Sequence, residues 1–222
     1  MREVVFLDKD IEIFFSSGDP FIKVKEIEGT VYRDLANRIT KEFTINGKSY
    51  FVKTHFGVGW FEIFKNLLQF KKPSYSSLDE WKALNRLQET GLKCPEPLGY
   101  GVNGYNPAKL DSFIITRALS NTLSLEDITL NWKKNSPSKL VKDRLIFNVA
   151  MLSSKMHAMG MNHRDLYLCH FHVPKDDLLQ EMYIIDLHRA QIRKNTPHRL
   201  KIKDIGGLLH SALDLNLSER DF

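Results

Sequence analysis

Met161-Asn162-His163-Arg164-Asp165-Leu166 is the stretch of sequence that decides the fold, and Ile184-Ile185-Asp186 is its counterpart further along the chain. The first stretch follows a long amphipathic segment that ends at Gly160, so it should form a loop after a helix. The second has two β-branched residues before an acid, which predicts a short strand ending in a carboxylate. We therefore expect two loops, each presenting one aspartate.

A lysine and a glutamate lie upstream of these loops in elements of the right kind. Tyr50-Phe51-Val52-Lys53 places Lys53 at the end of a hairpin strand, and Asn46-Gly47 is the two-residue turn of that hairpin. Glu80 lies in a predicted helix from Ser77 to Thr90. Strand lysine, helix glutamate, His-Arg-Asp loop and strand-end aspartate is the order of parts in a kinase-type phosphotransferase.

Each part has a physical role in phosphoryl transfer, which requires a neutralised terminal phosphate and an acceptor hydroxyl in line with it. Lys53 can hold the α and β phosphates, and Glu80 can hold Lys53 in place. Asp165 can orient the acceptor hydroxyl and take its proton, and Asp186 can bind Mg²⁺. Two interpretations of Glu80 stay open, because Ser77 and Glu80 also have the spacing of a capping box.

The chain as a whole predicts a β-rich part followed by a helical part. We expect a β-rich N-terminal lobe over residues 1–116, with helices near 59–70 and 77–90. A helical C-terminal lobe should cover residues 117–222 and carry the catalytic and metal-binding loops, the join lying around 117–122. The predicted fold class is α+β.

Finer boundaries follow from local patterns. Residues 21–31 alternate loosely in hydrophobicity, which is typical of a strand. A long helix should begin at Ser136-Pro137, an N-cap followed by proline at the first helical position. Residues 201–217 should form the last helix.

The composition is that of an ordinary globular protein, with 222 residues of which 42% are hydrophobic and 27% charged, and this excludes disordered, collagen-like and coiled-coil classes. A net charge of +5 indicates an anionic partner without choosing among nucleotide, nucleic acid, phospholipid and phosphorylated glycan. Cys94 and Cys169 predict free thiols in a reducing cytosol. We expect no secretory signal, because the N-terminus has no apolar h-region followed by a small-residue cleavage site. We expect no membrane span, because no apolar run approaches about 18 residues.

Two longer segments identify a family. Tyr50–Leu67, with Gly57-Val58-Gly59-Trp60-Phe61-Glu62, and His163–Phe171 resemble the bacterial lipopolysaccharide core heptose(I) kinase family of the protein-kinase-like superfamily, and the resemblance runs from about Gly29 to Leu213. It implies a two-lobed protein-kinase-like fold with an antiparallel β-sheet N-lobe and a mainly helical C-lobe. It also implies ATP-dependent phosphorylation of the first inner-core heptose, at its 4-hydroxyl.

The resemblance further implies that the protein is cytoplasmic and contacts the inner membrane of a Gram-negative bacterium peripherally, on its cytoplasmic face. The implied partner is the lipopolysaccharide inner core, and no nucleic acid is expected. Family members usually continue with helix after the position of Phe222, which implies a truncated chain or a short member. Three alternatives stay open: a Kdo or other sugar kinase, a protein-tyrosine kinase, and a catalytically inactive binding module. The last is disfavoured because Lys53, Asp165 and Asp186 are all present.

The family motif assigns the catalytic residues. Asp165 matches the catalytic aspartate, Lys53 the phosphate-binding lysine, Glu80 its helix partner, and Asp186 the Mg²⁺ ligand. His170 lies where protein kinases place a metal-binding asparagine, although imidazole is a poor ligand for Mg²⁺. His170 therefore binds phosphate directly, or a single-metal mechanism applies.

The rest of the nucleotide site departs from the protein-kinase pattern. The turn expected near Arg33 to Arg38 has no glycine, so the Arg33 or Arg38 side chain should bind phosphate instead of the backbone. Thr116 is the expected gatekeeper, and adenine should lie between the lobes, against the backbone from Arg117 to Leu119.

Acceptor binding is expected from basic residues, because inner-core lipopolysaccharide carries carboxylates and phosphates. The run from His188 to Lys203 has no acid, and its alternative interpretation is a solvated basic face. The residues assigned to the acceptor are Arg164, Arg189, Arg193, Lys194 and Arg199.

Three further features have competing interpretations. The aromatic helix at 59–70 either packs on the N-lobe or rests on the membrane surface. His163 should be structural and Cys169 a small buried hydrophobe. A zinc site at His170-x-His172 is disfavoured.

Overall fold

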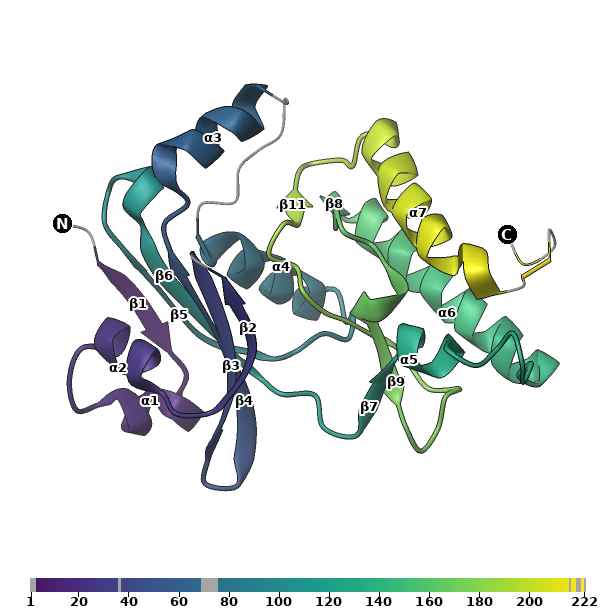
Figure 1. Ribbon diagram of the computed structural model, residues 1–222, viewed down its shortest axis with the longest axis horizontal. Coiled ribbons are helices and arrows are strands. Elements are labelled where there is room, and N and C mark those ends of the chain that lie inside the picture. The colour runs from purple at the N-terminus through teal and green to yellow at the C-terminus, as the bar shows by residue number, and fades with distance from the viewer. Residues whose placement is uncertain (1–2, 36, 69–75, 216, 219–220, 222) are drawn as a thin grey trace. The chain divides into compact units, whose positions relative to one another are not determined.

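The computed structural model describes residues 3–35, 37–68, 76–215, 217–218 and 221 (Figure 1). The chain divides into two compact units. The first comprises Met1–Asn85 and Pro95–Ala118, and the second comprises Arg86–Cys94 and Leu119–Phe222.

The first unit is built on a six-stranded antiparallel sheet in the order β1-β5-β6-β4-β3-β2. The β3–β4 hairpin turns at Asn46-Gly47, where both residues have a positive φ, as the sequence predicted. The strands are β1 (Val4–Leu7), β2 (Thr30–Leu35), β3 (Arg38–Ile45), β4 (Lys48–Phe56), β5 (Pro97–Asn103) and β6 (Asp111–Arg117).

Two short helices, α1 (Lys9–Phe15) and α2 (Pro20–Glu26), cover one face of this sheet (Figure 1). The strand predicted over residues 21–31 is therefore wrong: residues 21–26 are helical, and only residues 30 and 31 are extended, at the start of β2. The reason is local: Asp19 caps α2 through the backbone N–H of Phe21, and Pro20 fixes a helical φ at the first position. Side chains of both helices and of four strands form the core on this face: Ile11, Phe15, Phe21, Val24, Ile27, Phe43, Tyr50, Val52, Leu98, Phe113 and Ile115.

The helix α4 (Leu78–Glu89) lies against the other face. It buries Ala83, Leu84 and Leu87, and the ring of Trp81 packs 4.7 Å from that of Tyr100 on β5. Because side chains alternate along a strand, Val52 of β4 faces the core described above and Lys53 faces α4. The helix α3 (Gly59–Leu68) packs near the short 3₁₀ helix η1 (Pro107–Lys109). Residues 69 and 70 of its predicted range lie outside the described residues.

The second unit is mainly helical. Its longest element is α6 (Lys139–Ala158), with α5 (Leu125–Thr129), α7 (His198–Ala212) and the 3₁₀ helix η3 (Leu213–Leu215). The predicted start of α6 at Ser136-Pro137 is wrong: Ser138 is the N-cap, because its hydroxyl accepts the Val141 N–H at 3.3 Å. The last helix, predicted over residues 201–217, begins earlier: α7 starts at His198 and ends at Ala212, and η3 follows to Leu215. Residue 216 lies outside the described residues.

Short strands position the loops of the second unit. One sheet has the order β10-β9-β7, and a two-stranded sheet pairs β11 with β8. β8 immediately precedes the His-Arg-Asp loop, and β10 ends two residues before Asp186. These elements are β7 (Thr122–Ser124), β8 (Met161–Asn162), β9 (Phe171–Pro174), β10 (Tyr183–Ile184), β11 (Gln191–Ile192) and the 3₁₀ helix η2 (Leu168–His170).

Across the described residues, no helix has both the length and the apolar character that crossing a bilayer requires.

Candidate active site

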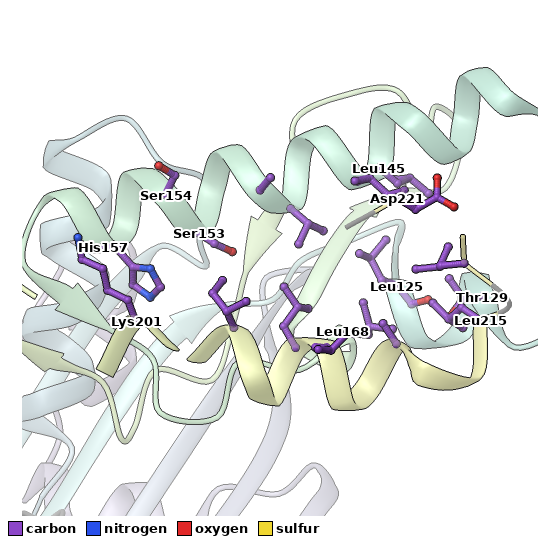
Figure 2. A pocket seen from close by; sticks show the side chains of 18 of the residues that line it. Leu125, Thr129, Leu145, Ser153, Ser154, His157, Leu168, Lys201, Leu215 and Asp221 are labelled. Carbon is purple, nitrogen blue, oxygen red and sulfur yellow. The ribbon is translucent and has the colours of Figure 1, made fainter. Parts of the chain in front are cut away.

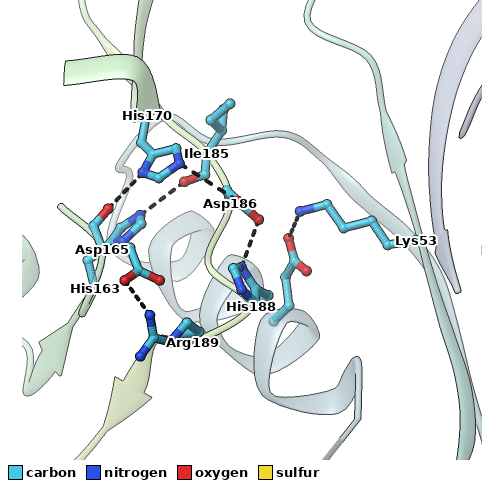
Figure 3. A network of polar contacts seen from close by, with 9 residues as sticks. Lys53, His163, Asp165, His170, Ile185, Asp186, His188 and Arg189 are labelled. Carbon is cyan, nitrogen blue, oxygen red and sulfur yellow. Dashed lines mark hydrogen bonds and ion pairs between the residues drawn. The ribbon is translucent and has the colours of Figure 1, made fainter. Parts of the chain in front are cut away.

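In the first unit, Lys53 of β4 and Glu80 of α4 form an ion pair with 2.6 Å between Nζ and Oε1 (Figure 3). The glutamate is buried, with 3% of its side chain exposed, and the lysine side chain is 18% exposed. Ser77 does not form a capping box with Glu80: its hydroxyl donates to the Phe113 carbonyl at 2.7 Å, and its N–H donates to Ser112. Glu80 is thus positioned for Lys53.

The backbone of the His-Arg-Asp loop is fixed by a buried carboxylate, Asp204 of α7. Its two oxygens accept the backbone N–H groups of His163 at 2.7 Å and Arg164 at 2.8 Å. His157 Nε2 lies 3.0 Å from the same side chain. Arg164 has a φ of 76°, a conformation that these contacts hold in place. Asp204 was not predicted as a site residue, and its one signal in the sequence is that it is the first acid after a long basic run.

Two stacked imidazoles connect the two loops. His163 is fully buried, and its Nε2 donates to the Ile185 carbonyl at 3.0 Å, next to Asp186 (Figure 3). Burial lowers the pKa of His163 to about 4, so the ring is neutral at pH 7. His170 packs on it with 5.2 Å between ring centroids, and its Nδ1 donates to the Asp165 carbonyl at 2.7 Å. The expected structural role of His163 agrees with this burial.

Asp186 has a φ of 58°, in the left-handed region that aspartate tolerates better than most residues. His188 Nδ1 lies 2.9 Å from its Oδ1, and His170 Nε2 lies 3.7 Å from its Oδ2. Both oxygens of this carboxylate therefore face polar groups.

Arg189 contacts the other aspartate. Its Nη1 donates to Asp165 Oδ1 at 2.6 Å, and the Asp165 side chain is 16% exposed. One carboxylate oxygen is therefore held by a cation. Arg189 is therefore in contact with a site residue and is not only a surface cation.

The remainder of the basic run is not uniform. Arg193 donates to Asn162 Oδ1 at 2.6 Å and also contacts Gln191, so it connects β8 and β11. Lys194 and Arg199 are exposed. The run therefore includes both structural cations and a surface of exposed ones.

Of the residues predicted for the nucleotide, Glu80 lies on α4 and Leu119 belongs to the second unit, and the others lie on strands of the first unit: Lys53, Arg33, Arg38, Thr116 and Arg117. Arg33 is inside β2 and Arg38 begins β3, so the turn between these strands is shorter than predicted. Arg117 on β6 is bound to Glu96 at 2.6 Å and Asp10 at 2.7 Å, and these hydrogen bonds, the one to Glu96 first, raise its pKa. Its guanidinium thus has carboxylate partners within its own unit, and Thr116 beside it is half-buried.

No group of three or more His, Cys, Asp or Glu side chains suited to a metal ion occurs among the residues that can be described. His170 and His172 have different surroundings, since His172 Nδ1 lies 3.3 Å from the Thr122 hydroxyl.

A cavity of about 580 Å³ lies within the second unit, between α6 and α7, and the sequence analysis did not anticipate it (Figure 2). Most of its lining is aliphatic, with His157 and Lys201 at one end in the figure and Asp221 at the other. Its lining includes Leu125, Leu145, Val149, Leu168, Leu208 and Leu209.

Comparisons with known proteins agree with this geometry. Residues 23–222 match the lipopolysaccharide kinase (Kdo/WaaP) family. The lipopolysaccharide core heptose(I) kinase WaaP of Escherichia coli K12 is 42% identical over 98% of this chain and 84% of its own length, and its Pseudomonas aeruginosa PAO1 namesake is 41% identical over 97% and 82%. A solved structure of WaaP in complex with acyl carrier protein matches with a TM-score of 0.81 and 36% identity, over 100% of this chain and 85% of that one. This match confirms the predicted kinase-like α+β fold.

Proposed function

Because the chain belongs to the lipopolysaccharide kinase (Kdo/WaaP) family, we propose that it transfers the γ-phosphoryl group of ATP to the 4-hydroxyl of the first heptose of the lipopolysaccharide inner core. The Lys53–Glu80 ion pair carries the reaction class, because a strand lysine held by a buried helix glutamate is a working part of kinases. The acceptor is taken from the relatives named heptose(I) kinase.

Asp165 is the proposed general base. The heptose hydroxyl oxygen attacks the γ-phosphorus, the bond from that phosphorus to the β–γ bridging oxygen breaks, and ADP leaves. Asp165 orients the hydroxyl and accepts its proton. Arg189 holds Oδ1 of this carboxylate, so Oδ2 is the oxygen that we assign to the hydroxyl. Arg189 is then a positioning residue, and the acceptor contact predicted for it is secondary.

Lys53 is the proposed partner of the ATP phosphates, with Glu80 keeping its ammonium in place. Arg33 and Arg38 remain candidates for further phosphate contacts. The backbone from Arg117 to Leu119 remains the candidate for adenine, with Thr116 as the gatekeeper. Arg117 would contribute through its backbone, because Glu96 and Asp10 bind its side chain.

Asp186 is the proposed Mg²⁺ ligand. The donor set fits, because Mg²⁺ in kinases takes one or two carboxylates together with phosphate oxygens and waters, so a cluster of three protein ligands is not required. When bound, Mg²⁺ supplies neutralisation of the charge on the β and γ phosphates. His170 donates through Nδ1 to the Asp165 carbonyl, so a hydrogen bond from its Nε2 to a phosphate oxygen requires the doubly protonated ring.

The acceptor is a lipid-linked glycan with many negative charges, and we propose that Arg164, Lys194 and Arg199 contribute to its binding. Lys194 and Arg199 are exposed, which supports this assignment. Arg193 is reassigned to the β8–β11 contact described above. We propose that the reaction takes place at the cytoplasmic face of the inner membrane.

Acyl carrier protein is a proposed partner, because the similar solved structure is that of WaaP in complex with acyl carrier protein, and the cavity between α6 and α7 supports this. A carrier of acyl chains presents a long apolar group, and an aliphatic cavity of about 580 Å³ is within the size range of small-ligand sites. Ala150→Phe should narrow the cavity, and Met151→Phe, on the same helix and outside the lining, is its control. Acylated carrier protein should raise the melting temperature of the parent and of Met151→Phe, and it should raise that of Ala150→Phe less. An equal effect of carrier protein without an acyl chain would contradict this use of the cavity.

The deciding experiment for the kinase proposal is phosphate transfer from radiolabelled ATP to two lipopolysaccharides, one bearing and one lacking the inner-core heptose. Asp165→Asn should keep nucleotide binding but lower the turnover about 10²–10⁴-fold, which is the usual contribution of a positioned base. Turnover within about threefold of the parent would remove Asp165 from the mechanism. Label on the heptose-free acceptor would favour a Kdo kinase.

A further inference from the structure

The helix α3 presents apolar side chains to solvent. Its exposed residues range from 50% exposure at Trp60 to 83% at Phe61, and Ile63 is the buried apolar side chain of this helix. The exposed set, named the α3 face from here on, is Trp60, Phe61, Phe64, Leu67 and Leu68. Within the part of the chain that the structure describes, the α3 face is therefore left uncovered by its own unit.

These side chains form one continuous stripe. Successive residues of an α-helix are about 100° apart around its axis, so the α3 face occupies an arc of about 120°. Ile63 lies at one edge of the arc, beside the contact with η1. Glu62 and Lys65 lie on the polar side, where they form an ion pair of 3.2 Å. Trp60 and Phe64 stack with 5.9 Å between ring centroids.

The composition of this region fits an anionic bilayer better than a protein groove. Large aromatic and aliphatic side chains on one side of a helix, with charges on the other, are typical of helices that lie in the membrane interface. Glu62 balances the charge of Lys65, and the exposed Lys109 on η1, near which α3 packs, adds a net positive charge beside the apolar stripe. Anionic phospholipid attracts such residues.

We propose that α3 docks on the surface of an anionic phospholipid bilayer, with the α3 face inserted among the lipid chains at the headgroup boundary. The inference rests on the proposed function, because the acceptor of that reaction is a glycolipid held in a membrane. A helix of ten residues is about 15 Å long, which is enough to lie in the interface and too short to cross it. Docking holds the enzyme where its acceptor is.

The test uses the whole chain and vesicles made of phosphatidylethanolamine with phosphatidylglycerol. Phe61→Ser combined with Leu68→Ser should lower the fraction that cosediments with the vesicles by at least about tenfold, since each side chain loses a large apolar contact with lipid. The matched control is Ile13→Ser with Ile22→Ser, because these residues are also exposed and apolar but lie on α1 and α2. The control should bind as the parent does.

A second measurement reports the contact directly. Brominated lipid in the same vesicles should quench tryptophan fluorescence of the parent, and Trp60→Phe should remove most of that quenching while Trp81 and Trp132 remain. Vesicles of phosphatidylcholine alone should bind the parent more weakly, because they carry no net charge. Unchanged sedimentation of the Phe61/Leu68 variant, or quenching that survives Trp60→Phe, would overturn the proposal.

Two further outcomes separate this inference from its rivals. Concentration-dependent dimerisation without lipid, abolished in the Phe61/Leu68 variant, would make the α3 face a self-association surface and would overturn the docking. Activity on a deacylated, water-soluble core oligosaccharide should be the same in parent and variant. If no heptose acceptor is phosphorylated while vesicle binding still depends on the α3 face, the proposed function fails and the docking stands.

Discussion

At the scale of single residues, His163 makes the stability of the second unit depend on pH. Its pKa is about 4 in the folded protein, because burial disfavours the charged ring, and 6.5 is its ordinary value in an unfolded chain. Between about pH 6.5 and pH 4, His163 is therefore protonated in the unfolded state and neutral in the folded state. The contribution of His163 is complete above about pH 6.5 and is lost as the pH falls toward 4.

His163→Gln should reduce this dependence, because glutamine can still donate to the Ile185 carbonyl but does not titrate. Between pH 7.5 and pH 5.5 the parent should lose about 1.4 kcal/mol more unfolding free energy than the variant, one unit of differential protonation. Urea unfolding at the two pH values measures the difference. Parallel losses in both proteins would show that the proton is taken up elsewhere.

At the scale of elements, β4 and α4 are connected by the Lys53–Glu80 pair. Glu80→Gln should leave α4 folded and lower turnover by at least about tenfold, because the neutral amide no longer holds the ammonium in place. Glu89→Gln is the matched control: it removes an exposed ion pair with Arg86 on the same helix, and such pairs contribute little. Steady-state kinetics that fail to separate the two variants would remove Glu80 from the nucleotide site.

The end of α6 gives a prediction about packing. Gly160 has a φ of 86°, and a Cβ at this position would lie 1.9 Å from the Arg193 carbonyl oxygen. Gly160→Ala should therefore destabilise the protein by more than about 1 kcal/mol. In Gly206→Ala, inside α7, the added methyl meets no atom within 4 Å, and the change should stabilise by up to about 1 kcal/mol. Thermal unfolding should move in opposite directions for the two variants.

At the scale of the whole molecule, charge should govern the encounter with the acceptor. Replacing Lys194 and Arg199 together by serine should raise the apparent KM for lipopolysaccharide several-fold and flatten its salt dependence, because each basic residue near an anionic membrane contributes about 1 kcal/mol. The KM for ATP should stay within about twofold, since Lys53 is untouched. Kinetics at two ionic strengths decide this, and a rise in the KM for ATP alone would assign these residues to the nucleotide. Arg193 is left in place because it contacts Asn162.

Much of the fold could be predicted from the sequence, because the strongest signals in the sequence were local. Asn46-Gly47 predicted the hairpin through backbone conformation, and the family resemblance inferred from the motif around Asp165 is confirmed by the match over residues 23–222. The α2 helix was missed because its few apolar residues resemble an alternating strand, and the cap at Asp19 decides between the two.

The parts of the site that escaped prediction depend on partners distant in sequence. Asp204 contacts the backbone of a loop 40 residues away, and nothing beside it in the sequence marks that partner. Arg189 was assigned to the acceptor from its charge, and only tertiary structure shows the contact with Asp165. The cavity between α6 and α7 has no sequence signal at all, because its lining comes from separate helices whose apolar faces look alike whether they meet or leave a space.

The contact between Asp204 and the His-Arg-Asp loop has a consequence for acceptor selection. Arg199 and Asp204 lie on the same rigid helix, and Asp204 holds the backbone next to Asp165. If Arg199 receives the acceptor and Asp165 deprotonates it, as proposed, the spacing between these two groups is set by α7. We expect such an enzyme to reject acceptors whose anionic group and reactive hydroxyl are separated by the wrong number of sugar units, even when the sugar that carries the hydroxyl is correct.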